Sequence, residues 1–343
     1  MSAPYRHRNW LLGLTLLAAM LSASSIQAQG WQPLPPPATS SLPPTTSNES
    51  VGTRAIASDQ PEPQGFWETA GSVVAGGLVD WRNLEPNVSG DLPWMWQVVP
   101  EGLIWRSYLA GIKEPRLSVA MVDSSQMGTI WDAMMGGRVS LLRYGTPNAY
   151  RPEGWEVQIE AAAQPRIWPT EPSAPLIATD YRVGVPIVYA RGQWQFKTGY
   201  HHISSHLGDE FMELNPDIDR INYMRDSWMF AVGYYYTDNL RLYGEMDYAF
   251  GCDGGAEPIE FQFGADWSPA VRGGAPFFAT YVNLREELDY GGFFVVQTGW
   301  QWRGGDAMKT FRLGAQYVNG KNSQYEFYDD FEQQVGFGIW YDY

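Results

Sequence analysis

Three of the chain's four histidines lie in one short segment, residues 199–211, and one of them is spaced from a serine in a way that could do chemistry. His202 and Ser204 are two positions apart, so in a β-strand their side chains leave the same face. A histidine placed there can take the proton of a serine hydroxyl that attacks an ester carbonyl. A third polar group must orient the imidazole, and Asn222 and Asp226 have the parity for this on the next expected strand. The spacing makes His202 and Ser204, with either Asn222 or Asp226, the candidates for a hydrolytic site.

The same segment admits two other interpretations. His206, Asp209 and Glu210 offer an imidazole and two carboxylates close together, and these groups are ligands for Ca²⁺ or a transition metal. An Asp-Glu pair at the start of a loop is also common as a solvated turn. The plainest interpretation is a structural corner, in which polar residues at a membrane rim bond to loop backbone. The sequence favours this corner and leaves hydrolysis and a metal site, with Ca²⁺ as its cofactor, as alternatives.

A repeating strand pattern positions these residues, and it is clearest at the carboxyl-terminal end, residues 335–343. Every second residue there is apolar, and the residues between them are small or polar apart from Trp340. Period-2 alternation indicates a strand with one apolar and one polar face. The segment ends on the aromatic Tyr343 and resembles the closing strand of bacterial outer-membrane β-barrels, whose apolar face meets lipid. An edge strand of a soluble sandwich is the other interpretation.

The alternation recurs from about residue 114 in about twelve segments, each near the length of a membrane-spanning strand. The segments are 116–121, 137–144, 155–161, 180–189, 193–206, 226–237, 240–250, 259–267, 276–286, 294–303, 311–317 and 333–343. The pattern predicts an all-β fold, an antiparallel transmembrane β-barrel of about 12 strands over residues 111–343. The connections expected on the periplasmic side are 190–192, 237–239, 268–275 and 303–309, and those expected outside are 206–225, 251–258, 286–292 and 319–332.

The inward faces of these segments carry charges of both signs on neighbouring strands. They include Glu156, Glu160, Arg182, Lys197, Arg241, Glu245, Asp247, Glu260, Asp266, Arg303 and Arg312. A barrel of about twelve strands has a narrow lumen, whereas a wide diffusion pore usually needs about 16. We expect these charges to pair across the lumen and largely fill it. The sequence therefore favours a structural or narrow-transport barrel with a mostly plugged polar lumen.

The residues before the barrel divide into three parts. Residues 1–28 have the basic start, short apolar run and small residues of a secretory signal peptide. Residues 29–64 are rich in Pro, Ser and Thr, which predicts a disordered linker. Residues 65–110 hold too many aromatics for a linker, and we expect an irregular segment at the periplasmic mouth, with 102–109 as a candidate extra strand.

Composition limits the partners and the location. The net charge of −15 argues against nucleic acid, because nucleic acid is bound by basic surfaces. A single cysteine, Cys252, excludes an internal disulfide. Aromatic residues make up 15% of the chain, which suits the interfacial girdles of a membrane barrel. We expect the bacterial outer membrane as the location, with membrane lipid and, through the closing strand, the barrel-assembly machinery as partners.

Two families resemble this chain. The pair His202 and Ser204 on the lipid side of an outer strand is similar to outer-membrane phospholipase A and the lipid A deacylases, which implies a histidine base and a serine nucleophile. The run from Tyr200 to Asp226 and the strand at 240–244 resemble the uncharacterised bacterial family of domain of unknown function 1207, found in chlamydiae and planctomycetes. This second likeness covers roughly residues 70–343. It implies an outer-membrane-type protein and no assigned activity.

Overall fold

The computed structural model describes residues 93–147, 150–271, 273–304 and 309–343. The signal peptide expected at 1–28 and the linker expected at 29–64 lie outside these residues, and so does the part of the next segment up to residue 92.

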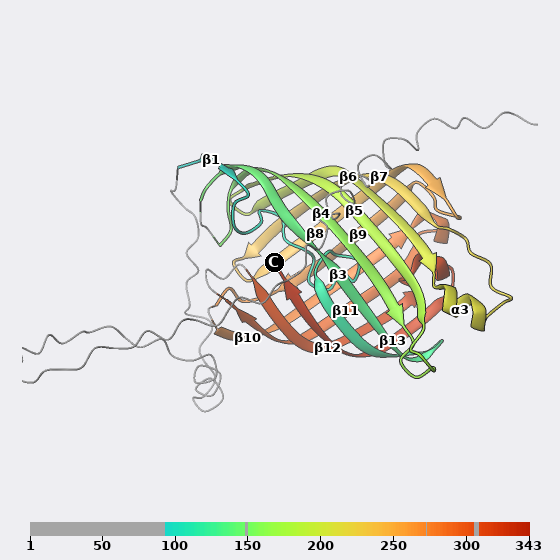
Figure 1. Cartoon of the computed structure of the whole chain (residues 1–343). Coiled ribbons are helices and arrows are strands. Elements are labelled where there is room, and N and C mark those ends of the chain that lie inside the picture. Colours follow the sequence, from blue (N-terminus) through green and yellow to red (C-terminus); the bar gives the residue numbers. More distant parts are fainter. Residues whose placement is uncertain (1–92, 148–149, 272, 305–308) are drawn as a thin grey trace, which may run out of the picture. The chain divides into compact units, whose positions relative to one another are not determined.

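Twelve of the described strands close into one antiparallel barrel (Figure 1). They are β2 (Leu117–Ser124), β3 (Gly128–Gly145), β4 (Gly154–Ile167), β5 (Leu176–Arg191), β6 (Trp194–Leu207), β7 (Met224–Thr237), β8 (Leu240–Asp253), β9 (Ile259–Trp267), β10 (Gly273–Arg285), β11 (Gly291–Arg303), β12 (Thr310–Lys321) and β13 (Phe331–Asp342). Each pairs with the next, and β13 pairs with β2, which leaves no open edge between the first and last strands of the ring. The predicted fold class is confirmed.

The connections separate the two ends of the barrel. At one end, here called the turn end, β5 and β6 are joined through residues 192–193, and β7 and β8 through residues 238–239. At the other, the loop end, residues 208–223 join β6 to β7 and carry α3 (Asp209–Leu214). Two short 3₁₀ helices, η3 (Glu286–Leu288) and η4 (Tyr325–Phe327), also lie in loop-end connections. Among the described residues, no helix has both the length and the apolar character needed to cross a membrane.

One short strand stands outside the predicted set. β1 (Met95–Val98) pairs with the last residues of β3 and extends the sheet at the turn end. The candidate strand at 102–109 is not a strand in the structure. The barrel wall begins at Leu117, since the residues just before it turn into the lumen.

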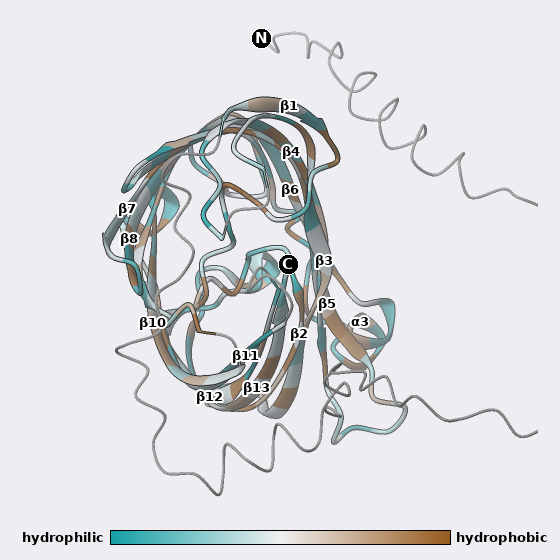
Figure 2. Cartoon of the chain, turned by 90° about the vertical axis from the view of Figure 1, so that its left-hand side faces the viewer, coloured by the Kyte–Doolittle hydropathy of each residue, from teal (hydrophilic) through white to brown (hydrophobic). Residues whose placement is uncertain are grey.

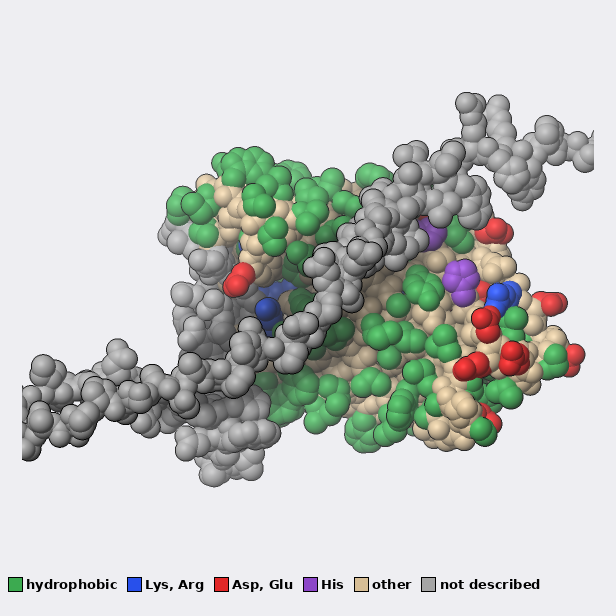
Figure 3. Space-filling model, viewed as in Figure 1, with side chains coloured by type: hydrophobic (Ala, Val, Ile, Leu, Met, Phe, Trp, Pro, Cys, Tyr) green, Lys and Arg blue, Asp and Glu red, His purple; other side chains and the backbone are tan. Residues whose placement is uncertain are grey.

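The apolar face of each strand points outward. In β13, Val335 and Phe337 are 58% and 68% exposed, whereas the neighbouring Trp340 is 3% exposed. Ring contacts form a band near the turn end, through Trp96–Tyr144, Trp155–Tyr189 and Trp194–Tyr234. A second band lies nearer the loop end, through Tyr200–Phe250, Phe261–Tyr290 and Phe294–Tyr317. An apolar wall between two aromatic bands is the surface expected of a barrel in a bilayer, and Figure 3 shows the apolar wall with acidic side chains gathered at the α3 end.

Candidate functional site

The lumen is occupied by the chain itself. Residues 103–116, here called the plug, run through the interior of the ring of strands without regular secondary structure (Figure 2). Trp105 and Tyr108 are fully buried, and they pack against inward-facing residues of the wall such as Val188, Tyr281 and Val295. Tyr108 also stacks on Tyr243 with ring centroids 3.8 Å apart. The plug therefore has its own apolar core inside an otherwise polar barrel.

Polar side chains of the wall form hydrogen bonds with the backbone N–H and C=O groups of the plug. Glu156 accepts a hydrogen bond from the backbone N–H of Ile104 at 3.1 Å. Asp266 accepts one from the N–H of Leu109 at 3.2 Å, and Arg312 donates to the Leu109 carbonyl at 3.0 Å. An irregular segment has no internal ladder of hydrogen bonds, so buried N–H and C=O groups need partners of this kind. Part of the inward charge predicted from the sequence serves this purpose.

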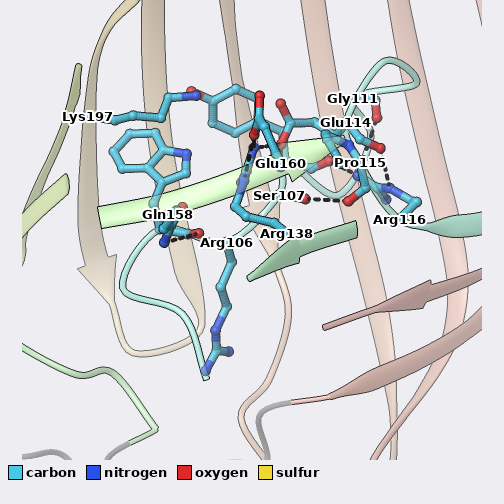
Figure 4. A network of polar contacts seen from close by, with 12 residues as sticks. Arg106, Ser107, Gly111, Glu114, Pro115, Arg116, Arg138, Gln158, Glu160 and Lys197 are labelled. Atoms are coloured by element: carbon cyan, nitrogen blue, oxygen red, sulfur yellow. Dashed lines mark hydrogen bonds and ion pairs between the residues drawn. The ribbon is translucent and has the colours of Figure 1, made fainter. Parts of the chain in front are cut away.

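Ion pairs link several of the other inward charges into a network, part of which is drawn in Figure 4. Glu160 on β4 lies between two arginines, Arg138 at 2.7 Å and Arg182 at 2.7 Å. Arg138 also reaches Glu114 of the plug at 3.3 Å. All four side chains are buried, so each charge depends on its partners. The network ties the plug to β3, β4 and β5.

We expect Glu160→Gln to lower the free energy of unfolding by about 3–5 kcal/mol, because it leaves buried arginines without their shared counter-charge. Urea unfolding of the detergent-solubilised barrel, followed by tryptophan fluorescence, measures this. Asp209→Asn is the control, because its pair with Arg220 is exposed and such pairs contribute little. Equal unfolding midpoints for Glu160→Gln and the parent would contradict a structural role of the network.

The loop end is closed by a second element. Residues 322–328, here called the cap, fold inward after β12 and are buried from Asn322 to Glu326. Gln324 donates to the Gln164 carbonyl at 3.1 Å, and Arg166 donates to Asn322 at 3.1 Å. The Tyr325 ring stacks on Tyr223 with centroids 4.5 Å apart. The lumen thus contains the plug and is covered by the cap.

On the outer wall, the structure brings two of the predicted site residues together. His202 on β6 and Asp226 on β7 are opposite each other in the strand register, and His202 Nδ1 lies 2.8 Å from Asp226 Oδ1. A carboxylate can only accept, so Nδ1 carries the proton and Nε2 is left as the basic nitrogen of the neutral ring. The Tyr200 hydroxyl donates to the same oxygen at 2.6 Å. Both side chains are about one-third exposed, at 32% and 30%, on the outward face near the aromatic band of the loop end.

The other two catalytic candidates are placed differently. Ser204 follows His202 on the same outward face of β6 and lies between Tyr181 and Met224 in the register. Among the described residues it makes no hydrogen bond to His202. Asn222 lies in the connection before β7, where its φ is 52° and its backbone N–H donates to Glu326. Asp226, and not Asn222, is the group that orients the imidazole.

The three proposed metal ligands do not lie together in the structure. His206 is exposed at the end of β6, and its ring lies 6.0 Å from that of Tyr181. Asp209 is paired with Arg220, and Glu210 is exposed in the first turn of α3. Within the part of the chain that is described, no three His, Cys, Asp or Glu side chains are grouped so that they could hold a metal ion.

The plug, the cap and the hydrogen bond from Tyr200 to Asp226 were not predicted from the sequence. The density of aromatics before residue 110 was the available signal for the plug, since Trp105 and Tyr108 are too apolar for a linker. The cap had no comparable signal, because Asn322, Ser323 and Gln324 read as an ordinary polar loop.

Comparison with known proteins places this barrel in a family. The family model described as "Protein of unknown function (DUF1207)" matches residues 93–343. The chain belongs to this family. The match confirms the resemblance noted in the sequence, and it covers the plug, every strand of the barrel and the cap.

Solved structures with a similar fold are outer-membrane barrels. Outer membrane phospholipase A from Escherichia coli has 11% sequence identity and a TM-score of 0.45, over 66% of this chain and 93% of that one. The Salmonella typhi outer membrane phospholipase dimer with bound calcium has 11% identity and a TM-score of 0.43, over 66% and 91%. A mutant Rh. blastica porin has 10% identity and a TM-score of 0.29, over 67% and 98%. No curated protein matches this sequence.

Proposed function

We propose that the protein is an outer-membrane barrel with a closed lumen, whose role is structural or limited to narrow transport. The observation that carries this proposal is the plug, because Trp105 and Tyr108 fill the lumen with buried aromatic side chains. The small cavities lined in part by plug residues measure about 10, 20 and 40 Å³, which leaves room for little more than single waters. The apolar outer wall and its aromatic bands support insertion in a bilayer.

Planar-bilayer recording tests this proposal directly. The purified full chain should give little or no conductance, because buried side chains of the plug occupy the lumen. Cell fractionation should find the mature protein in the outer membrane, and folded protein should migrate differently on gels before and after heating. Large, stable porin-like steps would overturn the closed lumen, and a soluble periplasmic product would overturn the location. Lipid and, through β13, the barrel-assembly machinery remain the proposed partners.

A second candidate function rests on the contact between His202 and Asp226. Ionisable residues on a lipid-facing wall are costly, and they are functional candidates for that reason. In this proposal, the Ser204 hydroxyl attacks a lipid ester carbonyl while His202 Nε2 takes its proton, and Asp226 holds the imidazolium that forms. His202 then returns the proton to the leaving alcohol. Water hydrolyses the acyl-enzyme with His202 again as base.

The test is release of fatty acid from phospholipid or lipid A in mixed micelles, with and without Ca²⁺. Ser204→Ala should abolish release, because it removes the nucleophile. Ser205→Ala is not a suitable control, since its hydroxyl bonds to Asp180 inside the barrel. Thr198→Ala is better matched, because Thr198 is on the outward face of β6 and its hydroxyl accepts a hydrogen bond from Trp228, which is not a site residue. A dependence on Ca²⁺ that His206→Ala removes would support the proposed metal site. Absence of activity under both conditions would leave the segment as a structural corner.

A further inference from the structure

The plug and the cap meet at one buried carboxylate, that of Asp180 on β5. Asp180 is 4% exposed and accepts hydrogen bonds from three different elements. Lys113 of the plug forms an ion pair with it, and the Ser205 hydroxyl of β6 donates to it. The backbone N–H of Tyr325 in the cap lies 3.3 Å from Oδ2. One side chain of the wall therefore holds both elements that close the lumen.

The Tyr325 ring makes a second link between the same elements. The Lys113 ammonium lies 4.5 Å from its centroid, and the Arg285 guanidinium carbon lies 5.2 Å from it. Burial raises the pKa of Tyr325 well above its usual range, so the ring stays neutral between these cations. The head group of Lys113 thus contacts the wall and the cap at once.

Further hydrogen bonds link Asp180 and the cap to residues at the outer surface. The Ser205 hydroxyl that donates to Asp180 also accepts a hydrogen bond from the Glu326 N–H at 3.2 Å. The Glu326 carboxylate accepts the backbone N–H groups of Ile221 and Asn222, both at 3.0 Å. Those two residues lie near the end of the connection 208–223, which carries α3. The contacts therefore run without a break from an exposed connection, through the cap, to the plug.

We propose that these contacts form a conformational latch, in which the plug and the cap hold each other closed. Release of the cap removes the Tyr325 N–H from Asp180 and the Tyr325 ring from Lys113, so water reaches the Lys113–Asp180 pair and weakens it. Release of Lys113 takes away a cation that packs on Tyr325. Coupling of this kind is reciprocal, so a change at either element must appear at the other. Arg241 and Arg312 hold the middle of the plug separately, so the latch acts on its Lys113 end.

Hydrogen–deuterium exchange of the full chain in detergent micelles tests the latch. The substitution Lys113→Met lies in the plug, yet we expect hydrogen–deuterium exchange at cap residues 322–328 to become roughly 5- to 100-fold faster. Tyr325→Leu changes only the cap, and exchange at residues 110–114 should rise by a similar factor. Arg241→Met is the matched control, because it loosens the plug at Arg106 and Ser107 without touching the cap.

The outcomes separate a latch from general loosening. Faster cap exchange in Lys113→Met but not in Arg241→Met supports the latch. An unchanged cap in Lys113→Met, or equal acceleration in both variants, overturns it. Should Lys113→Met not fold, Ser205→Ala removes the hydroxyl shared by Asp180 and Glu326 without removing a charge, and it must accelerate exchange in both elements. This result is independent of the conductance that tests the closed lumen.

Discussion

Replacing residues 103–112 by a glycine–serine segment of the same length is expected to turn a silent barrel into a conducting one. The change removes the apolar side chains that fill the lumen, including Trp105 and Tyr108. It keeps Glu114 and Arg116, which tie the end of the plug to the wall. The ring of strands closes by hydrogen bonds between β13 and β2, which do not involve the plug. We therefore expect the barrel to remain folded after the replacement. Planar-bilayer recording should show discrete open steps where the parent shows none.

The steps should be smaller than those of a general porin, because about sixteen strands are usual for a wide channel. A glycine–serine replacement of residues 215–219 is the control, since these residues lie in the connection at the loop end and outside the lumen. A folded replacement of 103–112 that stays silent, with the heat-dependent gel migration of the parent, would show that the plug does not close the lumen.

Asp226→Asn is expected to lower lipid-ester hydrolysis by about 10²–10⁴-fold if the outer-wall site is catalytic. Asp226 accepts a hydrogen bond from the N–H at His202 Nδ1, so the basic nitrogen is Nε2. An asparagine can donate its amide to Nδ1 instead, which would leave Nδ1 as the basic nitrogen and Nε2 with the proton. The fatty-acid release assay in mixed micelles measures the effect as kcat at saturating lipid.

Two matched variants make this result interpretable. Asp217→Asn removes an exposed carboxylate in the connection at the same end of the barrel that belongs to no proposed site, and activity should be unchanged. Asn222→Ala should also retain activity, because Asn222 is engaged through its backbone with Glu326. A parent enzyme with activity that Asp226→Asn preserves would contradict a catalytic role for the His202–Asp226 contact.

Most of the strands and the direction of their faces could be predicted from the sequence. The segment 259–267 was predicted to the residue, and the predicted outward residues of β13 are the exposed ones. Period-2 alternation is a local property, because each side chain leaves the strand opposite to its neighbours wherever the strand lies. Strand ends were predicted less closely: β5 was expected at 180–189 and spans Leu176–Arg191, because its first residues are buried one after another and show no alternation.

The tertiary structure alone decided which residues meet. Asn222 and Asp226 have the same parity, and only the path of the connection at 208–223 sets the register that puts Asp226 opposite His202. The course of the plug could not be predicted either, because an irregular segment carries no periodicity. Its position depends on wall groups far away in the sequence, such as Glu156 for Ile104 and Asp266 for Leu109. The alternation of a strand depends on neighbouring residues and can be recognised in the sequence. The position of the plug depends on contacts with wall residues that come close only when the barrel closes.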